Sequence, residues 1–104
     1  MIKLTILYPN SEGATFDLDH YLNVHVPMAH RLLEPAMKSY TVDYGILGGG
    51  PNVPPPFLAI GEQTYESVEA FMEVFMPNAP ELQGDIPKFT NVEPVIQFSE
   101  IRVG

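Results

Sequence analysis

The sequence predicts an α+β fold in which strands and helices follow one another in the order β-α-β-β-α-β. Four segments with alternating apolar residues are predicted as strands, at residues 2–8, 40–47, 57–64 and 92–103. Two segments with apolar residues at helical spacing are predicted as helices, at residues 17–33 and 66–75. Because this is the order of the ferredoxin-like arrangement, we expect one four-stranded antiparallel sheet with both helices on one face.

Turn residues separate the predicted strands. Every second residue of the segment 2–8 is apolar, and the proline, asparagine and glycine of residues 9–13 end this strand. The second strand places Tyr40 and Tyr44 on the same side, because side chains alternate along a strand. A loop rich in glycine and proline, residues 48–56, then leads to the third strand. Its length favours a functional or interface loop over a tight turn.

The first predicted helix begins at Asp17, whose side chain is expected to cap it. Phe16 precedes this cap and is placed to pack against Tyr21 as a hydrophobic staple. At 100° per residue, six side chains fall on one face roughly 100° wide: Leu18, Tyr21, Leu22, His25, Ala29 and Leu32. We therefore expect this face to be buried against the sheet.

Histidine residues and a proline mark the middle of this helix. His25 lies near the centre of the apolar face, whereas His20 and His30 fall outside it and are expected to be more exposed. Pro27 removes one backbone hydrogen bond and crowds the carbonyl of Asn23, so the helix should bend there. The bend would free a backbone carbonyl close to His25.

The second predicted helix, residues 66–75, follows the third strand, and Ser67 or a neighbour is expected to cap it. Residues 77–84 are predicted as a short helical turn closed by Gly84. Residues 85–91 are predicted as a loop that folds over one end of the sheet and carries Asp85. From there Asp85 could pair with His25 or with a substrate hydroxyl, or its carboxylate could cap local backbone amides.

Length and composition narrow the class of protein. A chain of 104 residues is expected to form a single domain, residues 1–104. Thirteen acidic against five basic residues, a net charge of −8, argue against nucleic acid as a partner. No apolar run is long enough to span a membrane, no signal peptide is recognised and cysteine is absent, so we expect a cytoplasmic protein. The second face of the sheet needs a cover, which predicts a homodimer closed into an α/β barrel.

One motif resembles a known family. The spacing Phe16-Asp17-x-x-x-Tyr21-x-x-x-His25-x-Pro27-Met28 resembles the signature of the EthD family of dimeric α/β-barrel proteins. The glycine-rich loop, the segment 67–71, the segment 85–87 and the last strand extend the resemblance over nearly the whole chain. It implies a small homodimer with a pocket between sheet and helices, and a histidine that acts as acid or base at the position of His25. It also places Tyr21 and Asp17 beside that histidine.

Three residues are candidate catalytic groups: His25, Tyr21 and Asp85. Histidine suits proton transfer near neutral pH, and an apolar surround can tune its pKa. The alternative is a core histidine bonded to backbone near the helix bend, with Tyr21 as an ordinary core aromatic. Candidate substrate-binding residues are Tyr44, Tyr40 and Phe16.

Metals and cofactors are not expected. Histidines at spacings of five are separated by ~140° on an α-helix, so they cannot bind one metal ion together. The run Gly48-Gly49-Gly50 lacks the lysine and the following helix of a phosphate-binding loop. No nicotinamide or flavin fingerprint is present.

These observations favour a cofactor-independent enzyme that acts on a small hydrophobic compound, aromatic or carbonyl-bearing. Relatives of the EthD family imply isomerase, cyclase, dehydratase or monooxygenase chemistry, and the sequence does not choose among them. The alternative is a dimer that binds or carries a small molecule without converting it. A purely structural module is a third alternative, and it would have no ligand-sized pocket.

Overall fold

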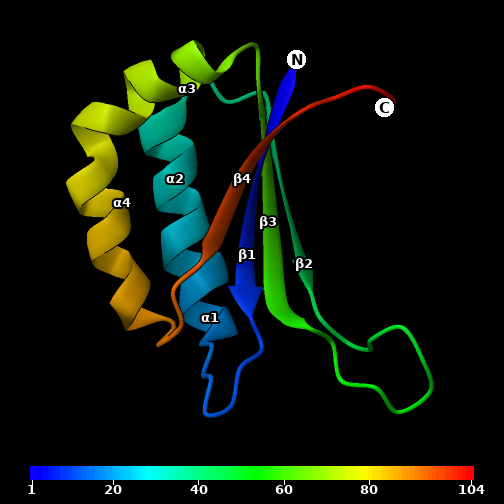
Figure 1. Cartoon of the computed structure of the whole chain (residues 1–104). Helices are drawn as coiled ribbons and strands as arrows, with labels where there is room; N and C mark the ends of the chain where they lie inside the picture. The colour runs from blue at the N-terminus through cyan, green and yellow to red at the C-terminus, as the bar shows by residue number, and fades with distance from the viewer.

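The computed structural model describes residues 1–104 and has the predicted order of elements (Figure 1). The strands are β1 (Ile2–Pro9), β2 (Ser39–Tyr44), β3 (Phe57–Tyr65) and β4 (Val95–Glu100). The first helix consists of α1 (Leu18–His20), the π-helical turn η1 (Tyr21–His25) and α2 (Val26–Leu33). The second helical region consists of α3 (Val68–Phe75), η2 (Met76–Asn78), α4 (Ala79–Asp85) and η3 (Ile86–Lys88), of which η2 and η3 are 3₁₀ turns.

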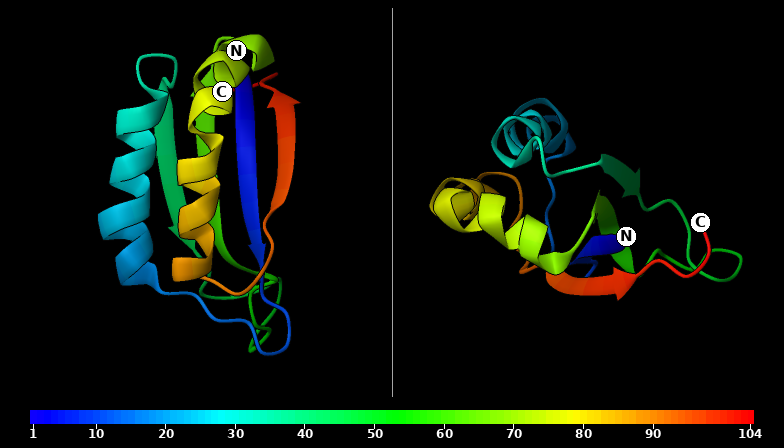
Figure 2. Two further views of the ribbon diagram at one scale, coloured as in Figure 1. Left: turned by 90° about the vertical axis from the view of Figure 1, so that its left-hand side faces the viewer. Right: turned by 90° about the horizontal axis from the view of Figure 1, so that it is seen from above.

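The sheet has the expected antiparallel topology. Its strand order is β2-β3-β1-β4, and each neighbouring pair runs antiparallel. The two helical regions lie side by side on one face of the sheet, as the views from the side and from above show (Figure 2). The α+β fold class and the ferredoxin-like order predicted from alternation are therefore confirmed.

Two clusters of buried side chains join the helices to the sheet. The larger one includes Leu4 of β1, Tyr65 of β3 and Phe71 of α3. The smaller one consists of Tyr8, Tyr21, Ala59 and Phe89, which lie toward the start of the first helix. Aromatic rings dominate the smaller cluster and meet edge to face, with the centroids of Tyr8 and Phe89 5.7 Å apart.

The first helix differs from the prediction because it contains the π-helical turn. The Val26 N–H donates to the carbonyl of Tyr21, five residues earlier, instead of four residues earlier as in an α-helix. Pro27 follows directly, so the wider turn lies where the proline ring would crowd the preceding turn. Leu22, which was expected on the buried face, is 43% exposed, because the extra residue shifts the register of the helix.

The boundaries around Asp85 also differ from the prediction. The helix α4 runs through Gly84 and includes Asp85, whereas the sequence predicted a helix end at Gly84 and a loop after it. Gly84 keeps a negative φ, so it does not act as a left-handed helix end. Asp85 consequently lies on a helix rather than on a loop, and 3₁₀ turn η3 continues the chain.

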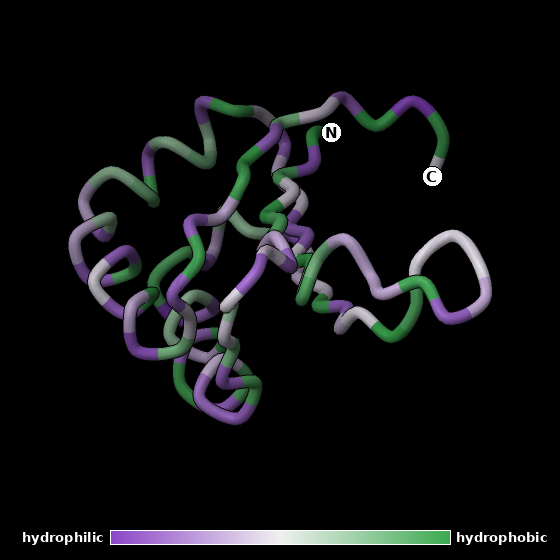
Figure 3. The backbone as a smooth tube through the Cα atoms, turned by 60° about the horizontal axis from the view of Figure 1, so that its bottom comes forward, coloured by the Kyte–Doolittle hydropathy of each residue, from purple (hydrophilic) through white to green (hydrophobic).

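Two strands are shorter than predicted. β2 ends at Tyr44, and residues 45–56 leave the sheet as a long projecting loop, which includes apolar segments (Figure 3). β4 spans Val95–Glu100 instead of residues 92–103. It is an edge strand that pairs only with β1. None of the helices has the length and apolar character needed to cross a membrane.

The start of α3 generates a stability prediction. The Ser67 hydroxyl caps α3 by accepting a hydrogen bond from the Ala70 N–H at 3.1 Å. Ser67→Ala leaves this N–H without its partner and should lower the free energy of unfolding by about 1 kcal/mol. Ser11→Ala, at an exposed turn without a side-chain hydrogen bond, is the matched control. Equal stability of the two variants in urea titrations would contradict the role of Ser67 as a cap.

Candidate functional site

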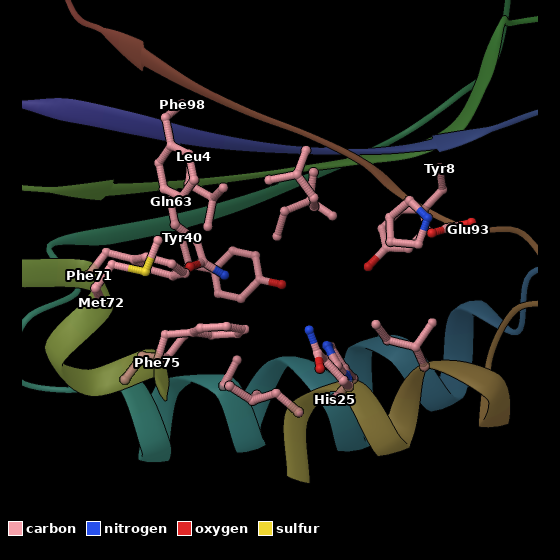
Figure 4. A pocket seen from close by; sticks show the side chains of 18 of the residues that line it. Leu4, Tyr8, His25, Tyr40, Gln63, Phe71, Met72, Phe75, Glu93 and Phe98 are labelled. Carbon is pink, nitrogen blue, oxygen red and sulfur yellow. The ribbon is translucent and has the colours of Figure 1, made fainter. Parts of the chain in front are cut away.

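A cavity of about 550 Å³ lies between the sheet and the helices. Side chains of all four strands and of both helical regions line it, and most of them are apolar. Phe71, Phe75 and Phe98 line one end, while His25, Tyr8 and Glu93 lie toward the other (Figure 4). Its volume is in the range of small-molecule binding sites.

His25 and Asp85 meet on the helical side of the cavity. The Nδ1 of His25 lies 2.9 Å from Oδ2 of Asp85, and both residues are 7% exposed. A carboxylate can only accept, so the Nδ1–H of His25 is the donor. The ring of Tyr21 stacks on that of His25, with centroids 5.6 Å apart, so the structure brings all three predicted catalytic residues together.

His20 binds the same carboxylate, which the sequence analysis missed. Its Nε2 lies 3.0 Å from Oδ1 and 3.2 Å from Oδ2 of Asp85. On an α-helix His20 and His25 would be separated by ~140°, but the π-helical turn between them places them on nearly the same side. The signal available in the sequence was Pro27, which indicates an irregular turn but not its type.

The pKa of His25 is lowered because the ring is buried, although the charge and hydrogen bond of Asp85 oppose that effect. Burial alone would raise the pKa of Asp85, but hydrogen bonds from His20 and His25 outweigh it and hold that pKa below its usual range. At neutral pH His25 is consequently neutral and Asp85 is ionised.

This protonation state defines the free nitrogen of His25. With the proton on Nδ1, Nε2 carries a lone pair. No protein group hydrogen-bonds to Nε2, and this atom is not sealed within the protein. Because His25 lines the cavity, its Nε2 is available to a bound molecule. The arrangement is that of a general base held by a carboxylate.

Tyrosine hydroxyls lie on the sheet side. The hydroxyls of Tyr21 and Tyr40 are 3.1 Å apart, and Tyr40 and Tyr8 line the cavity. Burial raises the pKa of Tyr21 and of Tyr8. It also raises the pKa of Tyr40, although the Tyr21 hydroxyl and the Gln63 amide oppose that rise. These phenols therefore stay protonated and serve as hydrogen-bond donors.

Gln63 is a polar cavity residue that the sequence analysis did not select. It is 3% exposed, and its Oε1 accepts a hydrogen bond from the Tyr65 hydroxyl at 2.6 Å. The sequence signal that could have found Gln63 is its position in the third strand. By alternation it lies on the same, inward face as Ala59 and Gly61. A polar side chain at an inward strand position needs a partner, which makes it a candidate for function.

A solved structure identifies the family to which this chain belongs. An EthD-like protein from Ralstonia eutropha JMP134 has a TM-score of 0.94 and 37% sequence identity with this chain, over 98% of this chain and 92% of that one. The chain belongs to the EthD family. The resemblance found in the helix motif is thereby confirmed.

More distant structures share the EthD fold. An ethyl tert-butyl ether D (EthD) family protein from Bacillus halodurans C-125 has a TM-score of 0.74 at 24% identity, over 97% of this chain and 98% of that one. A protein from Arabidopsis thaliana has a TM-score of 0.71 at 17% identity, over 100% and 98% of the two chains. No family model matches the sequence, and no curated protein matches it.

Other predicted site residues of this EthD-family chain lie outside the cavity. Tyr44 is 47% exposed and is not among the lining residues. Phe16 packs edge to face on Tyr8 and Tyr21, with centroids 5.1 Å from each, and supports the aromatic cluster. Asp17 caps the helix by accepting from the His20 N–H, as predicted.

The acidic and histidine side chains do not form a metal site. No group of three or more of them is arranged to hold a metal ion. His20, His25 and Asp85 instead satisfy one another by direct hydrogen bonds. The cavity also lacks lysine and arginine, so it offers no charged group to hold the phosphates of a nucleotide cofactor.

The pKa shifts predict the pH dependence of stability. A folded His25 binds its proton less readily than an unfolded one, so the unfolded state takes up more protons as pH falls through about 6.5. The free energy of unfolding should therefore fall below this pH, and the lowered pKa of Asp85 adds a further loss near pH 4.

Asp85→Asn tests the coupling of these two residues. The carboxylate raises the pKa of His25 against the effect of burial, so its removal should lower that pKa further in an NMR titration. Asp43→Asn, at an exposed acid of β2, is the control and should leave the His25 titration unchanged. A higher pKa of His25 in Asp85→Asn would contradict the assigned pair.

Proposed function

We propose that this EthD-family protein is a cofactor-independent enzyme that acts by acid/base chemistry on a small hydrophobic compound, aromatic or carbonyl-bearing. The observation that supports this function is the position of His25. Its Nδ1 is held by Asp85 at 2.9 Å, while its Nε2 is free at the wall of an apolar cavity of about 550 Å³. A packed core histidine would have no such free nitrogen.

His25 would remove a proton from the bound compound through Nε2 and return it to the product. Asp85 would stabilise the imidazolium that forms, since its carboxylate already accepts the Nδ1–H. His20 would hold the carboxylate in place from the other side, at 3.0 and 3.2 Å. Tyr40 and Tyr8 would donate hydrogen bonds from the sheet side of the cavity.

The alternative is a carrier that binds the same compound without converting it. The apolar lining supports this alternative as well, because burial of an aromatic ligand needs no proton transfer. The two functions differ in one measurable event, the exchange of a carbon-bound proton with solvent.

Solvent exchange of 1-tetralone, an uncharged aromatic ketone with acidic C–H groups, tests this difference. We expect the wild-type protein to accelerate deuterium uptake from D₂O, and the rate to rise with pH and level off below neutrality, because His25 must be neutral to act. His25→Ala should lower the protein-dependent rate by roughly 100-fold or more.

Arg31→Ala is the control for that measurement, since Arg31 is an exposed residue on the same helix. Retention of full exchange by His25→Ala would overturn the assignment of His25. Binding of 1-tetralone by NMR without any acceleration of exchange would favour the carrier instead of the enzyme.

We further propose that the protein is a homodimer, paired through the sheet face that carries no helices (Figure 2). An apolar row crosses this face, because Ile60, Leu7 and Val95 are direct cross-strand partners. Val95 is 51% exposed, and the projecting loop adds Ile46 at 91% and Leu47 at 55%. A second copy placed against this face would cover the row.

Leu7→Glu tests the dimer, because it places a charge in the centre of the apolar row. We expect the wild type to have twice the chain mass in light scattering at micromolar concentration, and Leu7→Glu to be monomeric. Met76→Glu is the control, since Met76 is 64% exposed on the helical layer. A wild-type protein that is monomeric in the same measurement would contradict the proposed assembly.

A further inference from the structure

We propose that Tyr40 and Gln63 form a binding subsite for a carbonyl oxygen on the sheet side of the cavity, so that the ligand is an uncharged carbonyl compound with an acidic C–H group. This inference rests on the proposed function and specifies its substrate class. The two residues are direct cross-strand partners on β2 and β3, which places their side chains next to each other on the inner face of the sheet.

The orientation of the Gln63 amide follows from the residue behind it. Tyr65 is 0% exposed, and its hydroxyl proton has Gln63 Oε1 as its acceptor at 2.6 Å. A flipped amide would leave this buried hydroxyl without an acceptor, which is costly. The Nε2 group is therefore the part of the amide that faces Tyr40 and the cavity, and its two N–H groups allow it to donate to a ligand as well as to the Tyr40 oxygen.

The hydroxyl of Tyr40 is oriented in the same way. Tyr21 is 0% exposed, and the Tyr40 oxygen at 3.1 Å is the hydrogen-bond partner of its hydroxyl. With Tyr21 as the donor of this hydrogen bond and Tyr40 as its acceptor, the O–H of Tyr40 is left to donate to a ligand. Gly61 makes this arrangement possible, because a Cβ at this position would lie 3.0 Å from the Tyr21 hydroxyl oxygen.

Two hydrogen-bond donors thus face one cavity, each on a residue that contacts a fully buried tyrosine. In the close-up, Tyr40 and Gln63 extend from the sheet and His25 lies across the cavity on the helical side (Figure 4). Donors on one wall and a base on the other fit a molecule that has an acceptor oxygen and an acidic proton on neighbouring atoms.

The charges around the cavity decide against an anionic ligand. None of the lining residues is lysine or arginine, and Glu93 is the charged residue among them. The whole chain carries a net charge of −8. A carboxylate or phosphate would lose its hydration in this cavity without gaining a cationic partner, whereas a neutral ketone needs only hydrogen-bond donors.

Proton transfer from such a ligand needs no cofactor, because every proton and electron pair has a place to go. The C–H bond next to the carbonyl breaks, its proton moves to Nε2 of His25, and its electron pair forms the C=C bond of an enolate. The negative charge develops on the carbonyl oxygen, where Tyr40 and Gln63 donate. Return of the proton from His25 to the same carbon or to another one completes exchange or isomerisation.

The test measures the carbonyl stretching frequency of bound 1-tetralone by infrared spectroscopy, because hydrogen bonds to the oxygen lower this frequency. Two double variants each remove one donor together with the buried phenol behind it: Tyr21→Phe/Tyr40→Phe and Gln63→Leu/Tyr65→Phe. Removing both partners avoids a buried hydroxyl without an acceptor, so these variants should fold. Circular dichroism and thermal unfolding confirm folding before the measurement.

We expect the bound ketone to absorb at a lower frequency in the wild type than in either double variant. Each double variant should bind 1-tetralone roughly 2- to 12-fold more weakly, while binding of tetralin, which lacks the carbonyl, should change little. Tyr44→Phe is the matched control, because Tyr44 lies on the same strand but outside the cavity. It should behave as the wild type does.

His25→Ala separates this subsite from the proposed function. The variant should keep the lowered frequency even though it loses exchange, because the oxygen donors remain. A lowered frequency in a wild type that never exchanges protons would support the subsite and contradict the enzyme. Equal frequencies in the wild type and both double variants, tighter binding of 2-naphthoate than of 1-tetralone, or no binding of 1-tetralone would overturn the subsite.

Discussion

The carboxylate of Asp85 is the contact on which the rest of the site depends. It accepts hydrogen bonds from His20 and His25 and links the end of α4 to the start of the first helix. A buried carboxylate without these partners would be costly, and so would a buried histidine with neither nitrogen bonded. The contact therefore fixes how the two helical regions lie against each other, and it sets which nitrogen of His25 faces the cavity.

The backbone irregularity in the first helix is the condition for this contact. A regular α-helix would direct His20 and His25 to different sides, and only one of them could reach Asp85. The π-helical turn removes this conflict at the point where Pro27 already prevents regular hydrogen bonding. A single π-helical turn thus accommodates the ring of Pro27 and also lets both histidines reach the carboxylate of Asp85.

The sheet side of the cavity is organised by buried phenols. Tyr21 and Tyr65 are completely buried, and each satisfies its hydroxyl on a cavity residue, Tyr40 or Gln63. Because a buried hydroxyl must have a hydrogen-bond partner, the phenols of Tyr21 and Tyr65 orient the polar groups of Tyr40 and Gln63 at the cavity wall. The polar groups in this otherwise apolar cavity are therefore positioned by the hydrogen bonds that the buried tyrosines of the core make.

Sequence alone determined the element order, the strand alternation, the caps at Asp17 and Ser67 and the family motif around His25, because these depend on residues close together in the chain. It also selected Asp85, but on a loop instead of a helix. Only the tertiary structure decided the contact between Asp85 and the two histidines and the cross-strand pairing of Gln63 with Tyr40. Those contacts join segments up to 65 residues apart and depend on a π-helical turn and on strand register, which local propensity does not encode.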